Sequence, residues 1–165
     1  MNFSPMMLDL EGTELTPVEK EVLQHPMVGG VIFFSRNYQS VEQVTHLVKT
    51  IRDETDKVNK PILIAVDHEG GRVQRFRSEF TELPAVASLG KFYSKDKSEA
   101  LRVSRLHGWL MAAEVKSVGI DFSFSPVLDL NYEVSDVIGD RAFHQDAMIV
   151  AELATAYIEG MRDAG

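Results

Sequence analysis

The chain has 165 residues, and 44% of them are hydrophobic, which is enough to form the core of a folded globular protein. The formal net charge is −8 and the basic residues form no run, so nucleic acid is not expected as a partner. The absence of cysteine excludes disulfides, thiolate metal sites and thiol nucleophiles within this chain.

The N-terminal residues 1–10 lack the basic stretch, apolar core and small-residue cleavage site of a signal peptide. The longest strongly apolar run, residues 28–34, is far shorter than the roughly 20 residues that cross a bilayer. We therefore expect a soluble, cytoplasmic protein with no membrane partner.

Short apolar runs alternate with helical patterns along the chain. The first run, residues 6–10, is followed by Thr16 and Pro17, which predict an N-cap and a first helical residue. That helix is expected to end near residues 25–26. The second run, residues 31–34, is too short and too rich in β-favouring residues to be a helix.

A second helix is predicted from the capping-box spacing of Ser40 and Gln43. Its expected buried stripe consists of Val41, Val44, Leu47, Val48 and Ile51. The third run, residues 61–66, is continuously apolar, as expected for a parallel strand that is covered on both faces.

A longer helix is predicted over residues 97–117, with Gly119 as its stop signal. Its expected buried residues are Leu106, Leu110, Ala113 and Val118, and Trp109 is assigned to helix packing. The fourth run, residues 120–130, is more polar at alternate positions, and a last helix is predicted over residues 146–164. The expected buried side of that helix is Val150, Ala154, Tyr157, Ile158 and Met161.

Strands that alternate with helices, and that are not linked in pairs by tight turns, usually lie parallel, so the predicted class is α/β. Two architectures fit this order. One is an open doubly wound sheet, and the other is half of a (β/α)8 barrel, whose full form needs about 250 residues. The composition does not separate them.

The densest functional signal directly follows the third run, in the segment Asp67-His68-Glu69-Gly70-Gly71-Arg72-Val73-Gln74-Arg75. In parallel α/β folds, ligands bind beyond the carboxyl ends of the strands. Two carboxylates at the end of an apolar strand are costly unless they meet a partner or a ligand. Arg72 and Arg75 are placed to pair with those carboxylates or to reach a substrate.

Several interpretations compete for this segment, and the simplest is a salt-bridged loop. A metal site on Asp67, His68 and Glu69 is not expected, because alternating side chains cannot converge on one ion. The glycine spacing matches no phosphate-binding fingerprint. A glycosidase carboxylate pair is disfavoured, since two carboxylates on one strand would approach a sugar from one side. The better role for Asp67 is to accept hydrogen bonds from two sugar hydroxyls.

The segment from Asp67 to Arg75, followed by Phe76 and then Leu83-Pro84, resembles the signature of the glycoside hydrolase family 3 β-N-acetylglucosaminidases. Three further stretches resemble the same family in the same order, namely residues 29–37, 124–131 and 138–143. Together they extend across nearly the whole chain.

The resemblance implies a (β/α)8 TIM barrel, of which this chain supplies about four βα units as the N-terminal part of a single catalytic domain. It implies a retaining β-N-acetylhexosaminidase that removes terminal N-acetylglucosamine from peptidoglycan fragments (muropeptides) during bacterial cell-wall recycling. No metal or organic cofactor is expected. The residues that match the family's sugar-binding positions are Asp67, Arg75 and Arg141.

The resemblance assigns no catalytic residue to this chain. The family's Lys-His-Phe-Pro-Gly-His-Gly segment, its acid/base His and its nucleophilic Asp follow the fourth helix, so we expect them beyond Gly165. This chain alone is then expected to be inactive, with the C-terminal half of the barrel as its partner. Two alternatives remain, a flavodoxin-like noncatalytic binding or regulatory module and a noncatalytic sugar-binding relative.

Other polar residues receive mainly structural assignments. Asp129 and Asn131 are expected to support the pocket, and Asp140 is a candidate partner for Arg141. His144 is expected at the surface near the pocket. His25, His46 and His107 are expected to pack or to lie at the surface, and His68 is expected to pack or to form a local hydrogen bond.

Overall fold

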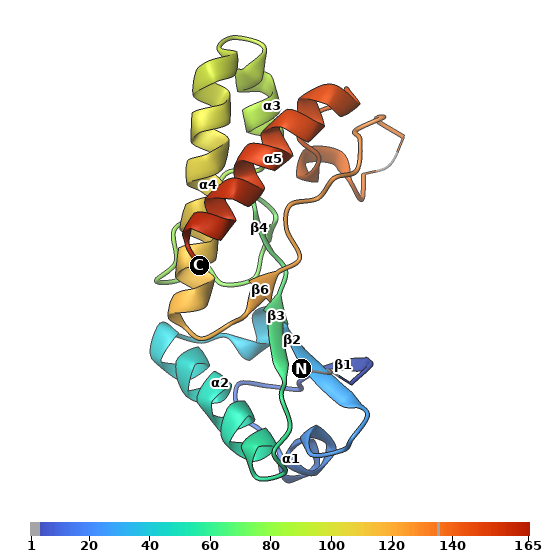
Figure 1. Ribbon diagram of the computed structural model, residues 1–165, viewed down its shortest axis with the longest axis vertical. Coiled ribbons are helices and arrows are strands. Elements are labelled where there is room, and N and C mark those ends of the chain that lie inside the picture. Colours follow the sequence, from blue (N-terminus) through green and yellow to red (C-terminus); the bar gives the residue numbers. More distant parts are fainter. Residues whose placement is uncertain (1–3, 135) are drawn as a thin grey trace. The chain divides into compact units, whose positions relative to one another are not determined.

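The computed structural model describes residues 4–134 and 136–165. The chain forms two compact units (Figure 1). Unit 1 comprises Met1–Asp67, Arg75–Phe80 and Val115–Ser123, and unit 2 comprises His68–Gln74, Thr81–Glu114 and Phe124–Gly165.

Unit 1 is built on a parallel four-stranded sheet in the order β1-β2-β3-β6. The strands are Met6–Asp9 (β1), Val28–Phe33 (β2), Leu63–Val66 (β3) and Phe122–Ser123 (β6). Over the described residues, the four strands lie in the sheet in the same order as in the chain, and this order never reverses. A doubly wound or flavodoxin-like sheet requires such a reversal, so the sequential order excludes both and favours the barrel arrangement.

Strand β3 lies between β2 and β6 and brings the functional segment to the middle of this sheet. Val66, its last residue, pairs with Phe33 of β2 on one side and with Ser123 of β6 on the other. Ile64, Ala65 and Val66 are fully buried, which confirms the expectation of a strand covered on both faces. Asp67 therefore follows a strand that is held by hydrogen bonds on both edges.

The helices of unit 1 begin where the sequence predicts. Helix α1, Pro17–Leu23, starts with a reciprocal capping box, in which Thr16 Oγ1 accepts from Glu19 N and a Glu19 carboxylate oxygen accepts from Thr16 N. Helix α2, Val41–Asp56, is capped by Ser40, whose hydroxyl accepts from Gln43 N at 3.1 Å. The predicted box at Ser40 is only half formed, because the Gln43 side-chain oxygen accepts from Gln39 N instead. Four of the five stripe residues of α2 are buried, namely Val44, Leu47, Val48 and Ile51.

Unit 2 contains an antiparallel hairpin that the sequence analysis did not predict. His68–Gly70 (β4) pairs with Val73–Gln74 (β5). The expectation that no two strands are joined by a tight turn is therefore wrong. The turn is possible because Gly70 and Gly71 adopt φ angles of 94° and 56°, a region that favours glycine.

Three helices accompany the hairpin: Ala87–Tyr93 (α3), Lys97–Ser117 (α4) and Ala147–Asp163 (α5). The last turn of α4, from Val115, belongs to unit 1. Helix α3 was not predicted, whereas α4 and α5 match their predicted ranges closely. Asp146 caps α5 by accepting from Met148 N at 2.8 Å.

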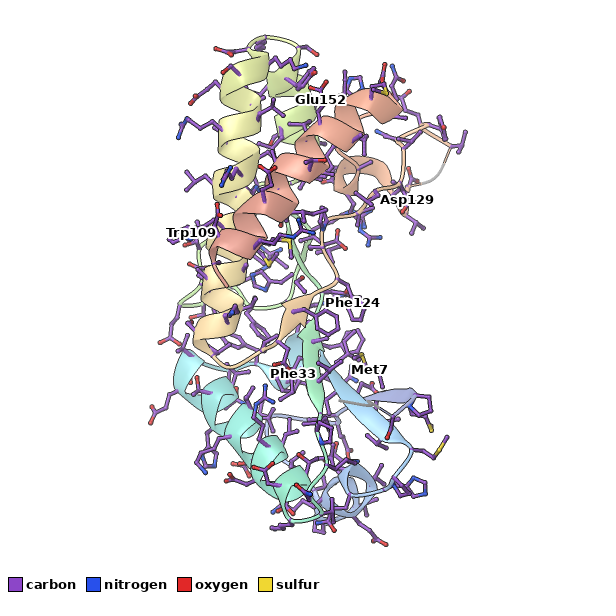
Figure 2. The ribbon with its side chains drawn as sticks, viewed as in Figure 1. Met7, Phe33, Trp109, Phe124, Asp129 and Glu152 are labelled. Atoms are coloured by element: carbon purple, nitrogen blue, oxygen red, sulfur yellow. The ribbon has the colours of Figure 1, made fainter. Side chains whose placement is uncertain are left out.

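The buried face of α4 differs from the predicted one. Ser104, His107 and Met111 are buried, whereas Leu106 is exposed. Trp109 is exposed as well (Figure 2). The physical reason is that α4 approaches α5 through small residues rather than large apolar ones. Ser104 donates a hydrogen bond to the Leu153 carbonyl at 2.8 Å. Likewise, a Cβ on Gly108 would lie only 2.1 Å from the Tyr157 carbonyl oxygen.

The fourth apolar run forms a shorter strand than predicted. Only Phe122–Ser123 pairs in the sheet. The described residues between β6 and α5 contain no regular element except the 3₁₀ turn Gly139–Arg141. Among the described residues, no helix combines the length and the apolar character that a membrane span requires.

Candidate functional site

A first group of candidate functional residues lies in unit 1, at the carboxyl end of β3. Arg75 Nη2 donates to Asp67 Oδ2 at 3.1 Å, and the two side chains are 26% and 25% exposed. Within the described residues, Asp67 Oδ1 accepts no hydrogen bond and the buried Nε of Arg75 donates none. Because the Asp67 side chain is partly exposed, Oδ1 is suited to accept hydrogen bonds from a ligand.

Two arginines connect the ends of three strands of unit 1. The guanidinium of Arg75 lies 5.5 Å from the centroid of the Phe34 ring, and that of Arg36 lies 4.9 Å from the same ring. Arg36 also forms an ion pair with Asp9, the last residue of β1. Neither Phe34 nor Arg36 was assigned a role of its own from the sequence. The signal that could have found them is their position directly after β2, because the carboxyl ends of parallel strands meet at one edge.

A second group of candidate functional residues lies in unit 2. Arg141 donates from Nε and Nη2 to the two carboxylate oxygens of Glu69, at 2.9 and 2.6 Å. The Glu69 side chain is only 6% exposed, whereas that of Arg141 is 24% exposed. Such a bidentate pair fixes the plane of the guanidinium as well as its position.

The pairing of the neighbouring charges differs from the expectation. Asp140 was the candidate partner for Arg141, but Asp140 accepts from Arg72 Nε at 3.0 Å. Arg72, which was expected to pair with Asp67 or Glu69 or to reach substrate, instead holds the segment that precedes Arg141. These pairs join residues that are about 70 positions apart, so the spacing along the chain did not reveal them.

A neutral cluster lies beneath the backbone of Glu69. His107 is 5% exposed and forms a hydrogen bond with the Glu69 backbone. Burial lowers the pKa of His107 from 6.5 to about 4, against the opposing effect of that hydrogen bond. Burial also raises the pKa of Tyr157, whose ring centroid lies 5.3 Å from that of His107. Both rings are therefore uncharged at neutral pH.

The other polar residues singled out by the sequence lie outside these two pairs. Asp129 is exposed (Figure 2). Asn131 accepts from Glu133 N at 3.1 Å within its own turn. His144 is half-buried and lines a shallow pocket of about 210 Å³ with Lys91 and Asn131. His68 is fully buried, so the expectation that it packs within the fold is confirmed.

Residues 7–165 match the Glycosyl hydrolase family 3 N terminal domain. The chain belongs to this family. Its fold class is therefore that of the (β/α)8 TIM-barrel family, as expected, with this chain supplying about four βα units. The matched residues include both Asp67 and Arg141.

The curated relatives that the chain matches include proteins named β-hexosaminidase. The chain is 53% identical over 166 residues to a β-hexosaminidase of Thioalkalivibrio sulfidiphilus, covering 100% of this chain and 47% of that protein. It is 48% identical to a β-hexosaminidase of Nitrosospira multiformis, covering 100% of this chain and 46% of that protein. The chain thus spans about half the length of the curated relatives it matches.

The chain also matches solved structures of related proteins. Native NagZ from Neisseria gonorrhoeae is 43% identical, with a TM-score of 0.94 over 99% of this chain and 47% of that one. A structure of the same protein in complex with N-trifluoroacetyl-D-glucosamine also has a TM-score of 0.94, and the match covers 46% of it. A glycoside hydrolase family 3 β-N-acetylglucosaminidase from Paenibacillus is 28% identical, with a TM-score of 0.85 over 96% of this chain and 29% of that one.

Proposed function

We propose that the full-length protein carrying this chain is a retaining β-N-acetylglucosaminidase. It removes terminal N-acetylglucosamine from peptidoglycan fragments in the cytoplasm, as a step of cell-wall recycling. Residues 1–165 are the first part of a single (β/α)8 catalytic domain, and the nucleophile and the acid/base lie outside them. The β-hexosaminidase relatives support the reaction class, and the N-acylated glucosamine held by the gonococcal protein supports the substrate.

The observation that carries this proposal is the half-satisfied carboxylate of Asp67 at the end of β3. Arg75 holds Oδ2, while Oδ1 has no partner among the described residues. A carboxylate in this state accepts hydrogen bonds from neighbouring sugar hydroxyls, each contributing about 1.5 to 3 kcal/mol. Arg75 orients the carboxylate through this hydrogen bond.

Arg141 and Arg75 supply the donors in the proposal. A guanidinium is always charged and donates from a rigid planar fork, so it suits the hydroxyl and carbonyl oxygens of an N-acetylated sugar. In the Glu69–Arg141 pair, the arginine is the accessible partner and the glutamate is buried. Arg141 is therefore the member of this pair that we assign to the sugar.

The three side chains are proposed to orient the sugar rather than to carry out bond cleavage. Fixing the terminal sugar places its anomeric carbon for attack. This lowers the activation barrier of the reaction and also improves substrate binding. Two charged hydrogen bonds to Asp67 together contribute about 3 to 6 kcal/mol, which corresponds to at least a hundredfold in kcat/KM.

The test uses the full-length protein and a chromogenic β-N-acetylglucosaminide. Asp67→Ala is expected to lower kcat/KM at least about a hundredfold. The control is Asp53→Ala, which removes an exposed carboxylate that pairs with Lys49 on α2, and it should keep the wild-type rate. Unchanged kinetics in Asp67→Ala would refute the role of Asp67, and a preference for β-glucosides without the acetamido group would refute the substrate.

A further inference from the structure

Arg141 lies in a segment of unit 2 that has almost no regular backbone structure. Between β6 and α5, the described residues form only the 3₁₀ turn Gly139–Arg141. Within that turn, Arg141 N donates to the Ile138 carbonyl at 2.9 Å. One such hydrogen bond does not fix the direction of a long side chain, because loops without a ladder of backbone bonds open easily. Other contacts must therefore orient the guanidinium.

Arg72, in the turn of the β4–β5 hairpin, holds the backbone of this segment. Its Nη2 lies 2.8 Å from the carbonyl oxygen of Asp136 and 2.6 Å from that of Val137. Its Nε lies 3.0 Å from Asp140 Oδ1. One planar guanidinium thus ties together the residues immediately before Arg141.

Glu69, in the first strand of the same hairpin, holds the side chain of Arg141. Both of its carboxylate oxygens accept from the guanidinium, and the carboxylate is almost fully buried. A buried carboxylate that loses its partner is destabilised by several kcal/mol, so the pair resists separation. The strand itself is fixed, because His107 bonds to the Glu69 backbone and a Cβ on Gly70 would lie 2.8 Å from the Pro84 carbonyl.

The space between these groups is too small for a ligand. Glu69, Arg72, Asp140 and Arg141 are among the residues lining a cavity of about 10 Å³, which is about the space that one water molecule occupies. A sugar cannot enter it. Since the Glu69 side chain is otherwise buried, an effect of Glu69 on a sugar passes through Arg141.

We propose that the β4–β5 hairpin is a positioning device for Arg141, in which Glu69 sets the plane of the guanidinium and Arg72 holds the backbone that carries it. This inference deepens the proposed function and rests on it for the role of Arg141 at the sugar. In this inference Glu69 and Arg72 are positioning residues that act through Arg141.

The first experiment measures KM and kcat of the full-length protein with the chromogenic substrate. Glu69→Gln keeps the shape but removes the charge, and Glu69→Asp keeps the charge but withdraws it by one methylene. A carboxylate can hold the Arg141 guanidinium only if it is charged and its side chain is long enough to meet both nitrogens. Each variant is therefore expected to raise KM about tenfold, equivalent to about 1.4 kcal/mol, with a smaller change in kcat. A KM restored by Glu69→Asp would mean that charge alone matters and would overturn the positioning role.

A double-mutant cycle tests whether Glu69 acts through Arg141. In an Arg141→Ala background, Glu69→Gln is expected to cause no further rise in KM. Independent, additive effects would overturn the inference. The matched control is Glu99→Gln, which disrupts an equally bidentate but exposed pair with Arg102 on α4 and should leave KM unchanged.

The second experiment needs no substrate. Amide hydrogen exchange of the full-length protein is compared between wild type and Arg72→Ala, with Arg102→Ala as control. Exchange at the Arg141 and Ala142 amides is expected to accelerate at least about tenfold in Arg72→Ala only, while α5 is unchanged. Unchanged exchange would refute the proposal that Arg72 holds the backbone around Arg141. It would not affect the proposal that Arg141 binds the sugar. A wild-type KM in Arg141→Ala would instead refute the sugar role, whatever the exchange shows.

Discussion

Arg75 and Asp67 are eight residues apart in the chain and form an ion pair, with Nη2 of the arginine 3.1 Å from Oδ2 of the aspartate. The same guanidinium lies over the ring of Phe34, 5.5 Å from its centroid. Arg75 is therefore held by a carboxylate at one edge and by an aromatic face on one side. The contact with the ring depends on the planar shape of the guanidinium.

Replacing Arg75 by lysine should impair the full-length enzyme even though the positive charge is kept. An ammonium group stacks less well on the Phe34 ring and cannot bond Asp67 and a sugar oxygen from one rigid plane, so we expect kcat/KM to fall by about 10- to 100-fold. Steady-state kinetics with the chromogenic substrate measure this. The same exchange at the exposed Arg102 should have no effect, and an Arg75→Lys enzyme with wild-type kinetics would show that the fork is not needed.

His107 should make the protein less stable in mild acid. Its pKa is about 4 when folded and 6.5 when unfolded, so between these values the unfolded chain binds a proton that the folded chain excludes. Stability is therefore complete above about pH 6.5 and decreases as the pH falls towards 4, by up to about 3 kcal/mol. Urea unfolding of the full-length protein at pH 7 and pH 4.5 measures the loss.

The matched variant is His107→Gln, whose amide can still donate to the Glu69 backbone but does not titrate. The carboxylates titrate in both proteins, so the difference between their pH profiles isolates the histidine. We expect the variant to lose less stability than wild type between pH 7 and pH 4.5. Parallel profiles would show that His107 titrates normally in the folded protein.

Helices α4 and α5 should not tolerate a methyl group at Gly160. A Cβ there would lie 1.8 Å from the carbonyl oxygen of Arg105, so one helix would have to move away from the other. We expect Gly160→Ala to reduce the free energy of unfolding by about 1 to 3 kcal/mol or more. Gly12→Ala is the control, because nothing lies within 4 Å of a Cβ at that position. Equal stability of the two variants would contradict the close approach of these helices.

The starts of the helices could be predicted from the sequence because their signals are local. Thr16 followed by Pro17 marks the beginning of α1, and Asp146 caps α5, with all partners within three residues. The continuously apolar run before Asp67 likewise indicated a buried parallel strand, and the paired strands confirm it. The Asp67–Arg75 pairing was also accessible, since the two residues are close in the chain.

The remaining features depend on contacts between distant residues. The buried face of α4 is set by its approach to α5 through Gly108 and Ser104, which an apolar pattern does not register. The partners of Arg72 and Arg141 were likewise misassigned, because proximity in the chain favoured Asp140 for Arg141 whereas the fold brings Glu69 to it. The β4–β5 hairpin brings Glu69 to Arg141. It is short and is marked in the sequence by the glycine pair at its turn, not by an alternating apolar pattern.

The most direct test of the sugar-binding role of Asp67 is a crystal structure of the full-length protein with N-acetylglucosamine. Both carboxylate oxygens of Asp67 are predicted to lie within about 3 Å of sugar oxygens, with the guanidinium groups of Arg75 and Arg141 also in contact with the sugar. A sugar bound elsewhere, with no hydrogen bond to Asp67, would contradict it.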